Sequence, residues 1–60
     1  MEKMKEEMDE MCKRAYQIRD EIVELRHYAF CRGFILPPLY DALGDIIKLI
    51  NSLESGRNKL

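Results

Sequence analysis

The sequence has no tryptophan, and its 60 residues include only two cysteines, two prolines and three glycines. Two cysteines are too few for a disulfide framework. On one helix Cys12 and Cys31 would lie roughly 28 Å apart, beyond the reach of a disulfide. No glycine or proline precedes Gly33, so nothing interrupts a helix over the first half of the chain. We therefore expect reduced thiols, as in the cytoplasm, and a fold stabilised by other means.

No sign of charge dominates either, since the formal net charge is −1 and residues 1–14 carry four bases and five acids. The chain therefore shows no basic block that would indicate a nucleic-acid footprint. No apolar run approaches the length of a membrane span, and the charged N-terminal residues 1–11 contain no apolar core of a signal peptide. We expect a cytoplasmic protein with no membrane partner.

The shortness of the chain limits how it can be stabilised. A domain of this length buries only about 60% of its unfolded surface when it folds alone. Small folds usually gain stability from disulfides, a metal ion or oligomerisation. With disulfides excluded and no metal-binding motif present, the sequence favours oligomerisation.

What the chain does have is a coiled-coil pattern through its first half, with apolar residues at alternating three- and four-residue spacing. The pattern predicts one helix over residues 2–32, ended by Gly33 in a left-handed conformation. A second apolar row widens the apolar face toward the end of this helix. The seam comprises Met1, Met4, Met8, Met11, Ala15, Ile18, Ile22, Leu25 and Ala29, and the second row Cys12, Tyr16, Val23 and Phe30.

Residues 33–37 predict a short apolar turn between two antiparallel helices. Pro37 keeps Leu36 out of the helical region, and Pro38 suits the first position of a second helix. That helix is expected over residues 38–55, with Gly56 as its stop and 56–60 as a polar tail. Gly44, inside it, is expected to permit close approach of another helix. Residues 1–60 therefore predict a single helical-hairpin domain.

Neither predicted helix can cover the other's apolar surface. The first is roughly 46 Å long and the second about 27 Å, so residues 1–14 should overhang. We expect an all-α helical hairpin that self-associates, as a homodimer, into an antiparallel four-helix bundle. Heptad spacing does not fix direction, but antiparallel pairing would place each overhang near the partner's second helix. The predicted oligomer core is Met8, Met11, Ala15, Ile18, Ile22, Leu25, Ala29, Leu39, Leu43, Ile46, Ile50 and Leu53.

Such a chain is expected to act by protein–protein interaction, as a small regulator, inhibitor, adaptor or assembly module. Methionine is flexible and polarizable, which suits an adaptable docking strip, and the apolar turn is a second candidate surface. The alternative is structural: the methionines form a loosely packed bundle end and the turn closes the core. The residues expected to contact a partner protein are Met1, Met4, Met8, Phe34, Ile35 and Leu36.

The sequence offers little catalytic or metal chemistry. His27 and Cys31 are spaced for joint binding of one metal ion, but they fall on the outer face, and no CxxC or HxxxH accompanies them. His27 and Asp41 or Asp45 could be drawn as an acid–base pair, yet no nucleophile motif, phosphate loop or cofactor signature is present. We expect no enzyme activity, no catalytic or metal site, no cofactor and no small-molecule substrate.

The alternative function is binding of RNA or DNA. Arg19 and Arg26 lie one heptad apart on one flank, and a dimer would double this row. In size and layout alone, with no shared residue motif, such a dimer resembles the plasmid copy-control family of RNA-binding helical hairpins; the resemblance implies RNA binding. The simpler interpretation is that the two arginines lie along the seam and pair with Glu21 or Glu24 across the interface between copies.

Overall fold

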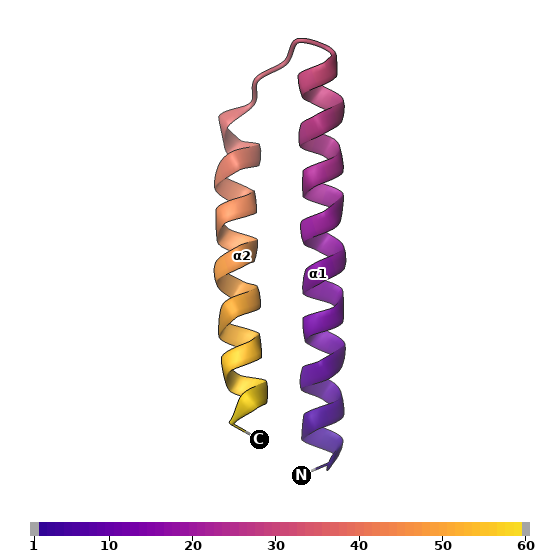
Figure 1. The fold of residues 1–60 in the computed structure, drawn as a ribbon, viewed down its shortest axis with the longest axis vertical. Helices are drawn as coiled ribbons and strands as arrows, with labels where there is room; N and C mark the ends of the chain where they lie inside the picture. The colour runs from indigo at the N-terminus through magenta and orange to yellow at the C-terminus, as the bar shows by residue number, and fades with distance from the viewer. Residues whose placement is uncertain (1, 60) are drawn as a thin grey trace.

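The structure, a computed structural model, describes residues 2–59 as two antiparallel helices that lie side by side (Figure 1). Helix α1 spans Glu2–Cys31 and helix α2 spans Pro37–Asn58. The all-α helical hairpin predicted from the sequence is confirmed. Its Cα radius of gyration is 14.3 Å, against about 10 Å for a compact domain of this length. Neither described helix has a stretch long and apolar enough to cross a bilayer.

A glycine cap ends α1. Gly33 has a φ of +83°, a conformation that glycine adopts without a steric penalty. The amide of Phe34 donates to the carbonyl of Ala29 at 2.9 Å, and that of Gly33 donates to the carbonyl of Phe30 at 3.0 Å. These two bonds are the Schellman motif, which satisfies carbonyl groups left free at the end of a helix. The predicted role of Gly33 is confirmed.

Two prolines begin α2. Leu36 is extended, as expected before a proline, with φ −117° and ψ 97°. The helix starts at Pro37, one residue earlier than predicted. Proline is tolerated in the first turn because the amides there have no intrahelical acceptor. Both Pro37 and Pro38 therefore lie in the first turn of α2, whereas the sequence predicted a helical position only for Pro38.

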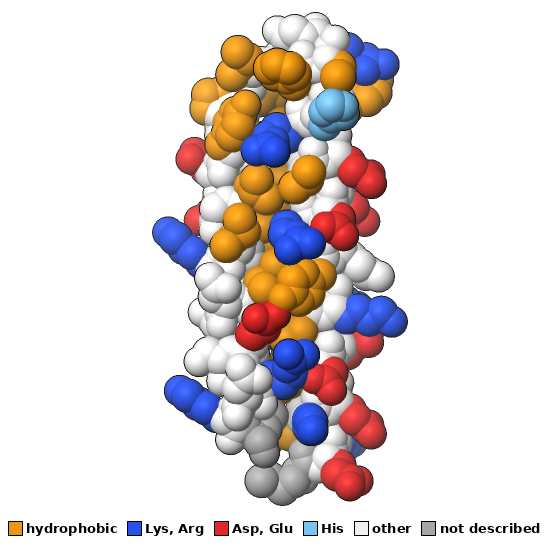
Figure 2. Space-filling view, viewed as in Figure 1, with side chains coloured by type: hydrophobic (Ala, Val, Ile, Leu, Met, Phe, Trp, Pro, Cys, Tyr) orange, Lys and Arg blue, Asp and Glu red, His pale blue; other side chains and the backbone are white. Residues whose placement is uncertain are grey.

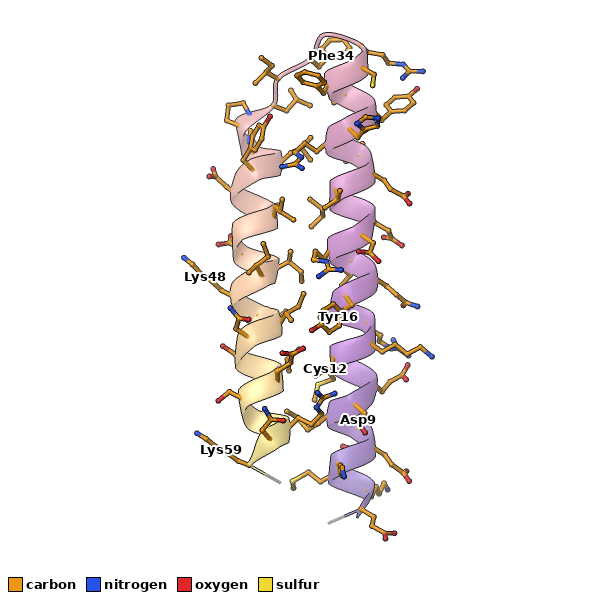
Figure 3. All side chains as sticks on the ribbon, in the orientation of Figure 1. Asp9, Cys12, Tyr16, Phe34, Lys48 and Lys59 are labelled. Atoms are coloured by element: carbon orange, nitrogen blue, oxygen red, sulfur yellow. The ribbon has the colours of Figure 1, made fainter. Side chains whose placement is uncertain are left out.

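The core between the helices is thin. Small residues on α1 let the bulkier isoleucines of α2 approach closely. The buried residues are Cys12, Ala15, Ala29, Ile46 and Ile50, and packed against the central cluster are Tyr16, Ile22, Leu43 and Leu53. Cys12 and Tyr16 project between the helices (Figure 3). Of the predicted core residues, Met11, Ile18 and Leu25 are exposed in the single chain.

The predicted end of the second helix is wrong, because α2 continues through Gly56 to Asn58. Gly56 lies against α1, where an added Cβ would come within 3.0 Å of the Met8 Cε atom. One residue further, a guanidinium nitrogen of Arg57 lies 3.6 Å from an Asp9 carboxylate oxygen. These contacts extend the helix pair to the level of Met8, so the predicted overhang is wrong for residues 8–14.

The expectation of a close helix approach at Gly44 is also wrong. Gly44 is exposed, and no atom lies within 4 Å of the position that its Cβ would occupy. Helical periodicity places Gly44 slightly more than half a turn from the buried Ile46, on the outer face of α2. The close approach occurs at Gly56 instead, because that glycine is beside the contact line.

Candidate functional site

Helix α1 contacts α2 along a line that excludes one row of its heptad pattern. The residues turned toward α2, all buried or half-buried, are Met8, Cys12, Ala15, Arg19, Ile22, Arg26 and Ala29. One row of the predicted seam, with a residue every seven positions, lies outside this line. Its members Met4, Met11, Ile18 and Leu25 are between 44% and 54% exposed. These four side chains recur every seven residues, so they form one continuous stripe along α1.

Helix α2 continues this stripe into an apolar face. Leu49 is 47% exposed. Together with Leu53 it lines a groove of about 220 Å³ whose other side is formed chiefly by Met11 and Ile18. We call Met4, Met11, Ile18, Leu25 and Leu49 the open face. None of the side-chain hydrogen bonds or ion pairs within residues 2–59 covers it.

Charged side chains border the open face on α1. Arg14 lines the apolar groove and forms an ion pair at 3.1 Å with Glu10, one turn earlier on the same helix. Glu21 and Leu25 together line a second shallow hollow of about 390 Å³. The border of the face therefore carries a positive charge at Arg14 and a negative charge one heptad later at Glu21.

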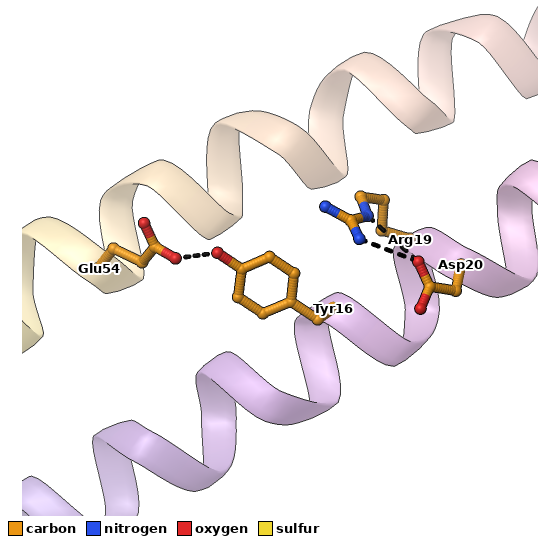
Figure 4. Close-up of polar contacts among 4 residues, drawn as sticks. All are labelled: Tyr16, Arg19, Asp20 and Glu54. Atoms are coloured by element: carbon orange, nitrogen blue, oxygen red, sulfur yellow. Dashed lines mark hydrogen bonds and ion pairs between the residues drawn. The ribbon is translucent and has the colours of Figure 1, made fainter.

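The opposite face of the hairpin has polar cover. Tyr16 is two residues before Ile18, so the two side chains point to opposite sides of α1. The Tyr16 hydroxyl donates a hydrogen bond to the Glu54 carboxylate of α2 (Figure 4). Figure 2, which shows this side, has basic and acidic side chains interspersed over the apolar strip between the helices.

The two arginines predicted to contact nucleic acid lie on this polar side, and the chain itself engages both. The Arg19 guanidinium lies 5.0 Å from the centre of the Tyr16 ring and donates to an Asp20 carboxylate oxygen at 3.0 Å (Figure 4). Arg26 lies over the ring of Tyr40 at 5.7 Å. The acid paired with Arg19 within residues 2–59 is therefore Asp20.

The apolar turn predicted to contact a partner protein is exposed. Phe34, Ile35 and Leu36 are 46% to 70% exposed. A hollow of about 350 Å³ beside them is lined by Val23, Arg26, His27, Phe30 and Tyr40. Of the predicted methionine strip, Met4 is exposed, Met8 is half-buried beside Gly56, and Met1 lies outside the described residues.

The pair of candidate metal ligands is brought together on the outer surface of α1. The Nε2 atom of His27 lies 3.6 Å from the Sγ atom of Cys31, and both side chains are exposed. Within residues 2–59 no group of three or more His, Cys, Asp or Glu side chains could hold a metal ion. The two residues can supply two ligands, whereas stable zinc sites in proteins use three or four.

Sequence reasoning missed the alternative line of contact. Cys12, Arg19 and Arg26 share one heptad position and lie along α2, although two of them are arginines. Their signal was the 3-4-3-4 spacing that they form with Ala15 and Ile22, which matches the pattern of the predicted seam. The sequence therefore contained two overlapping lines of residues at heptad spacing, and the fold uses the one that includes Arg19 and Arg26 for the contact between α1 and α2.

Residues 2–59 form an all-α helical hairpin whose exposed apolar surfaces include the open face and the turn end. Comparisons with protein-family models, with curated proteins and with solved structures found no match to the chain. The functional argument therefore rests on the geometry of the hairpin.

Proposed function

We propose that this chain is a small, non-enzymatic protein that self-associates through its open face into an antiparallel four-helix bundle, and that acts by binding another protein. The observation that carries the proposal is the stripe of half-exposed side chains from Met4 to Leu25 at heptad spacing. Apolar stripes with this period are typical of helices that pack against further helices. The proposed compartment, the cytoplasm, rests on cysteine usage in the sequence.

The surface area of the hairpin supports self-association. A monomeric protein of 7.1 kDa is expected to expose roughly 4,100 Å². The hairpin exposes 4916 Å². The excess, roughly 800 Å², is about the area that one subunit buries in a standard protein interface.

The chain cannot cover the open face itself, which favours a second copy as its occupant. Helix α2 already contacts α1 along its whole length, from Tyr40 beside Arg26 to Arg57 beside Asp9. A second hairpin offers the same apolar face, and a two-fold dimer brings identical patches together. The bundle core would then include Met11, Ile18 and Leu25, the three predicted core residues that the single chain leaves exposed.

Binding of another protein is proposed for the turn end. Phe30, Phe34 and Ile35 are each at least 60% exposed there. Packing of the open faces leaves this end of the hairpin at the surface, because the turn lies at the extremity of the long axis (Figure 1). An exposed apolar cluster of this kind is typical of protein-interaction sites.

Two isoleucines with matched exposure on opposite faces provide the test of self-association. Ile18 is 46% exposed on the open face and Ile47 is 43% exposed away from it. Ile18→Asp would bury an unpaired carboxylate in the dimer, and we expect it to abolish association at micromolar concentration. Ile47→Asp lowers the intrinsic helix propensity by the same amount, and we expect the mass of the dimer in solution to stay unchanged.

The measurement is sedimentation velocity of both variants beside the unchanged chain, with circular dichroism to follow helicity. Loss of the dimer in Ile18→Asp alone supports the proposal. Equal association of all three proteins would show that the open face is not the interface and would overturn it.

A further inference from the structure

We propose, resting on the self-association above, that the two hairpins pack with each α1 antiparallel to the partner's α1 and with their turns at opposite ends. A two-fold axis then crosses the open face at the level of Ile18 and Leu49. It brings Arg14 of each copy beside the partner's Glu21. This juxtaposition of charges selects one of two ways to stack the same apolar faces.

Stacking two such hairpins face to face has two symmetric solutions. If the two-fold axis runs across the hairpin, α1 lies on the partner's α1 and the turns point to opposite ends. If the axis runs along the hairpin, α1 lies on the partner's α2 and both turns share one end. Every adjacent pair of helices is antiparallel in both solutions, so the helix dipoles do not distinguish them.

Contacts within the hairpin establish which residues of α1 and α2 lie at the same height along its long axis, which we call the same level. Asp9 contacts Arg57 near the chain ends, and Arg26 contacts Tyr40 near the turn. Midway between these two contacts lie Ile18 on α1 and Leu49 on α2, by residue count. Both side chains line the apolar groove of the open face, in agreement with this register.

Apolar packing does not decide between the two solutions. With turns at opposite ends, Ile18 meets its own copy, Met11 meets the partner's Leu25, and Leu49 meets its own copy. With turns at one end, Ile18 meets the partner's Leu49 and Leu25 meets the partner's Ala42. Both arrangements place apolar side chains opposite Ile18 and Leu25, because the faces have the same heptad period.

The charged side chains that border the open face distinguish the two dimer arrangements. With turns at opposite ends, Arg14 lies within one residue of the level of the partner's Glu21, and symmetry makes two such ion pairs. With turns at one end, Glu21 lies within one residue of the level of the partner's Asp45, and symmetry makes two like-charge contacts. Glu21 has no ion-pair partner among residues 2–59, so the opposite-end dimer supplies one, and charge complementarity of this kind selects orientation.

This arrangement joins the two surfaces that the sequence analysis assigned to a partner protein. With α1 antiparallel to the partner's α1, Met4 lies at the level of the partner's Arg32, next to the turn. Met4 of one copy and the Phe34–Leu36 turn of the other then lie at the same end of the dimer, once at each end. A dimer so built presents two identical binding surfaces at the two ends of a rod.

Single cysteines test the arrangement. In a chain carrying Cys12→Ala and Cys31→Ser, Ile18→Cys places both thiols at the two-fold axis, where mild oxidation or a short bismaleimide is expected to link the copies. Leu25→Cys is the matched control. The two copies of residue 25 would lie about 20 Å apart along the helices, beyond disulfide reach.

Each outcome bears on a distinct claim. Linked dimers from Ile18→Cys but not from Leu25→Cys support the opposite-end arrangement. Linkage of Leu25→Cys to the same extent, or a dimer by light scattering that Ile18→Cys fails to link, overturns this arrangement and leaves self-association intact. A monomeric mass for the unchanged chain instead overturns the proposed self-association.

A charge reversal in the natural sequence gives a second, independent test. Glu21→Arg places like charges beside Arg14 of the partner in the opposite-end dimer, and we expect a roughly three- to tenfold higher dissociation constant. Adding Arg14→Glu restores opposite charges, and we expect it to recover most of the affinity. In the arrangement with turns at one end, Glu21→Arg would instead meet the partner's Asp45. Tighter association of this variant therefore overturns the proposal.

Discussion

The hydroxyl of Tyr16 on α1 donates a hydrogen bond to the carboxylate of Glu54 on α2, and this bond joins the two helices on their polar side (Figure 4). Both side chains are half-buried, and the Tyr16 ring also packs against the central core and carries the Arg19 guanidinium. One aromatic residue thus combines an apolar contact, a hydrogen bond and a cation–π contact. The contact helps to fix the register of the two helices.

Removal of this hydroxyl is expected to destabilise the hairpin without changing its assembly. Tyr16→Phe keeps the ring and leaves the Glu54 carboxylate half-buried without its donor, at a cost of about 1 kcal/mol. The control is Tyr28→Phe at an exposed tyrosine of the same helix, where we expect no measurable effect. Urea unfolding followed by circular dichroism at one protein concentration measures both. Equal stability of the two variants would contradict a structural role for the bond.

Two glycines with open space around them isolate the effect of backbone conformation. No atom lies within 4 Å of a Cβ added at Gly33 or at Gly44. Gly33→Ala forces alanine into a left-handed conformation and is expected to cost about 1 kcal/mol. Gly44→Ala lies on an exposed helical surface and is expected to stabilise by about 0.5–1 kcal/mol. Shifts of the same sign in thermal unfolding would contradict the assignment of these two positions.

Nucleic-acid binding is expected to be absent or weak, because the chain engages both candidate arginines. Anisotropy of a labelled RNA hairpin at low salt should show no saturable binding, since phosphate contacts require free guanidinium or ammonium groups. The alternative function predicts binding that is lost in the double variant Arg19→Glu, Arg26→Glu. Lys48, an exposed base that points away from α1 (Figure 3), provides the control variant Lys48→Glu. Binding lost in the double variant and kept in this control would establish the RNA-binding alternative.

Zinc is expected to be absent from the purified protein in stoichiometric amounts. His27 and Cys31 can supply two ligands from one copy, and a stable site needs at least one more. In the proposed dimer the two pairs lie toward opposite ends of the bundle, so they do not combine. Elemental analysis after gel filtration measures the content. One zinc ion per chain that disappears in Cys31→Ser would show that the pair is a metal site.

The parts of the fold that local chemistry determines were predictable from the sequence. Gly33 ends α1 because no other nearby residue suits a positive φ, and the extended Leu36 follows from the proline after it. The outer-face position of His27 and Cys31 follows from helical periodicity alone, and the structure places both there. Each of these features depends on a few neighbouring residues.

The line along which the helices meet depended on tertiary contacts and was not predictable in this way. Arg19 and Arg26 carry charges that the apolar pattern of the sequence excludes, but both side chains are half-buried and their guanidinium groups lie over tyrosine rings. At Gly56 the local signal for a helix end was overridden by the contacts of Met8 and Asp9 with the last turns of α2. The open face became visible only once this line of contact was known.

The molar mass of the unchanged chain in solution tests the central claim most directly. Light scattering during gel filtration, repeated over a hundredfold range of concentration, is the measurement, because association must follow mass action. The account predicts a mass twice the 7.1 kDa of the chain that decreases on dilution, together with high helicity by circular dichroism. A well-folded chain with a constant mass of 7.1 kDa at every concentration would contradict it.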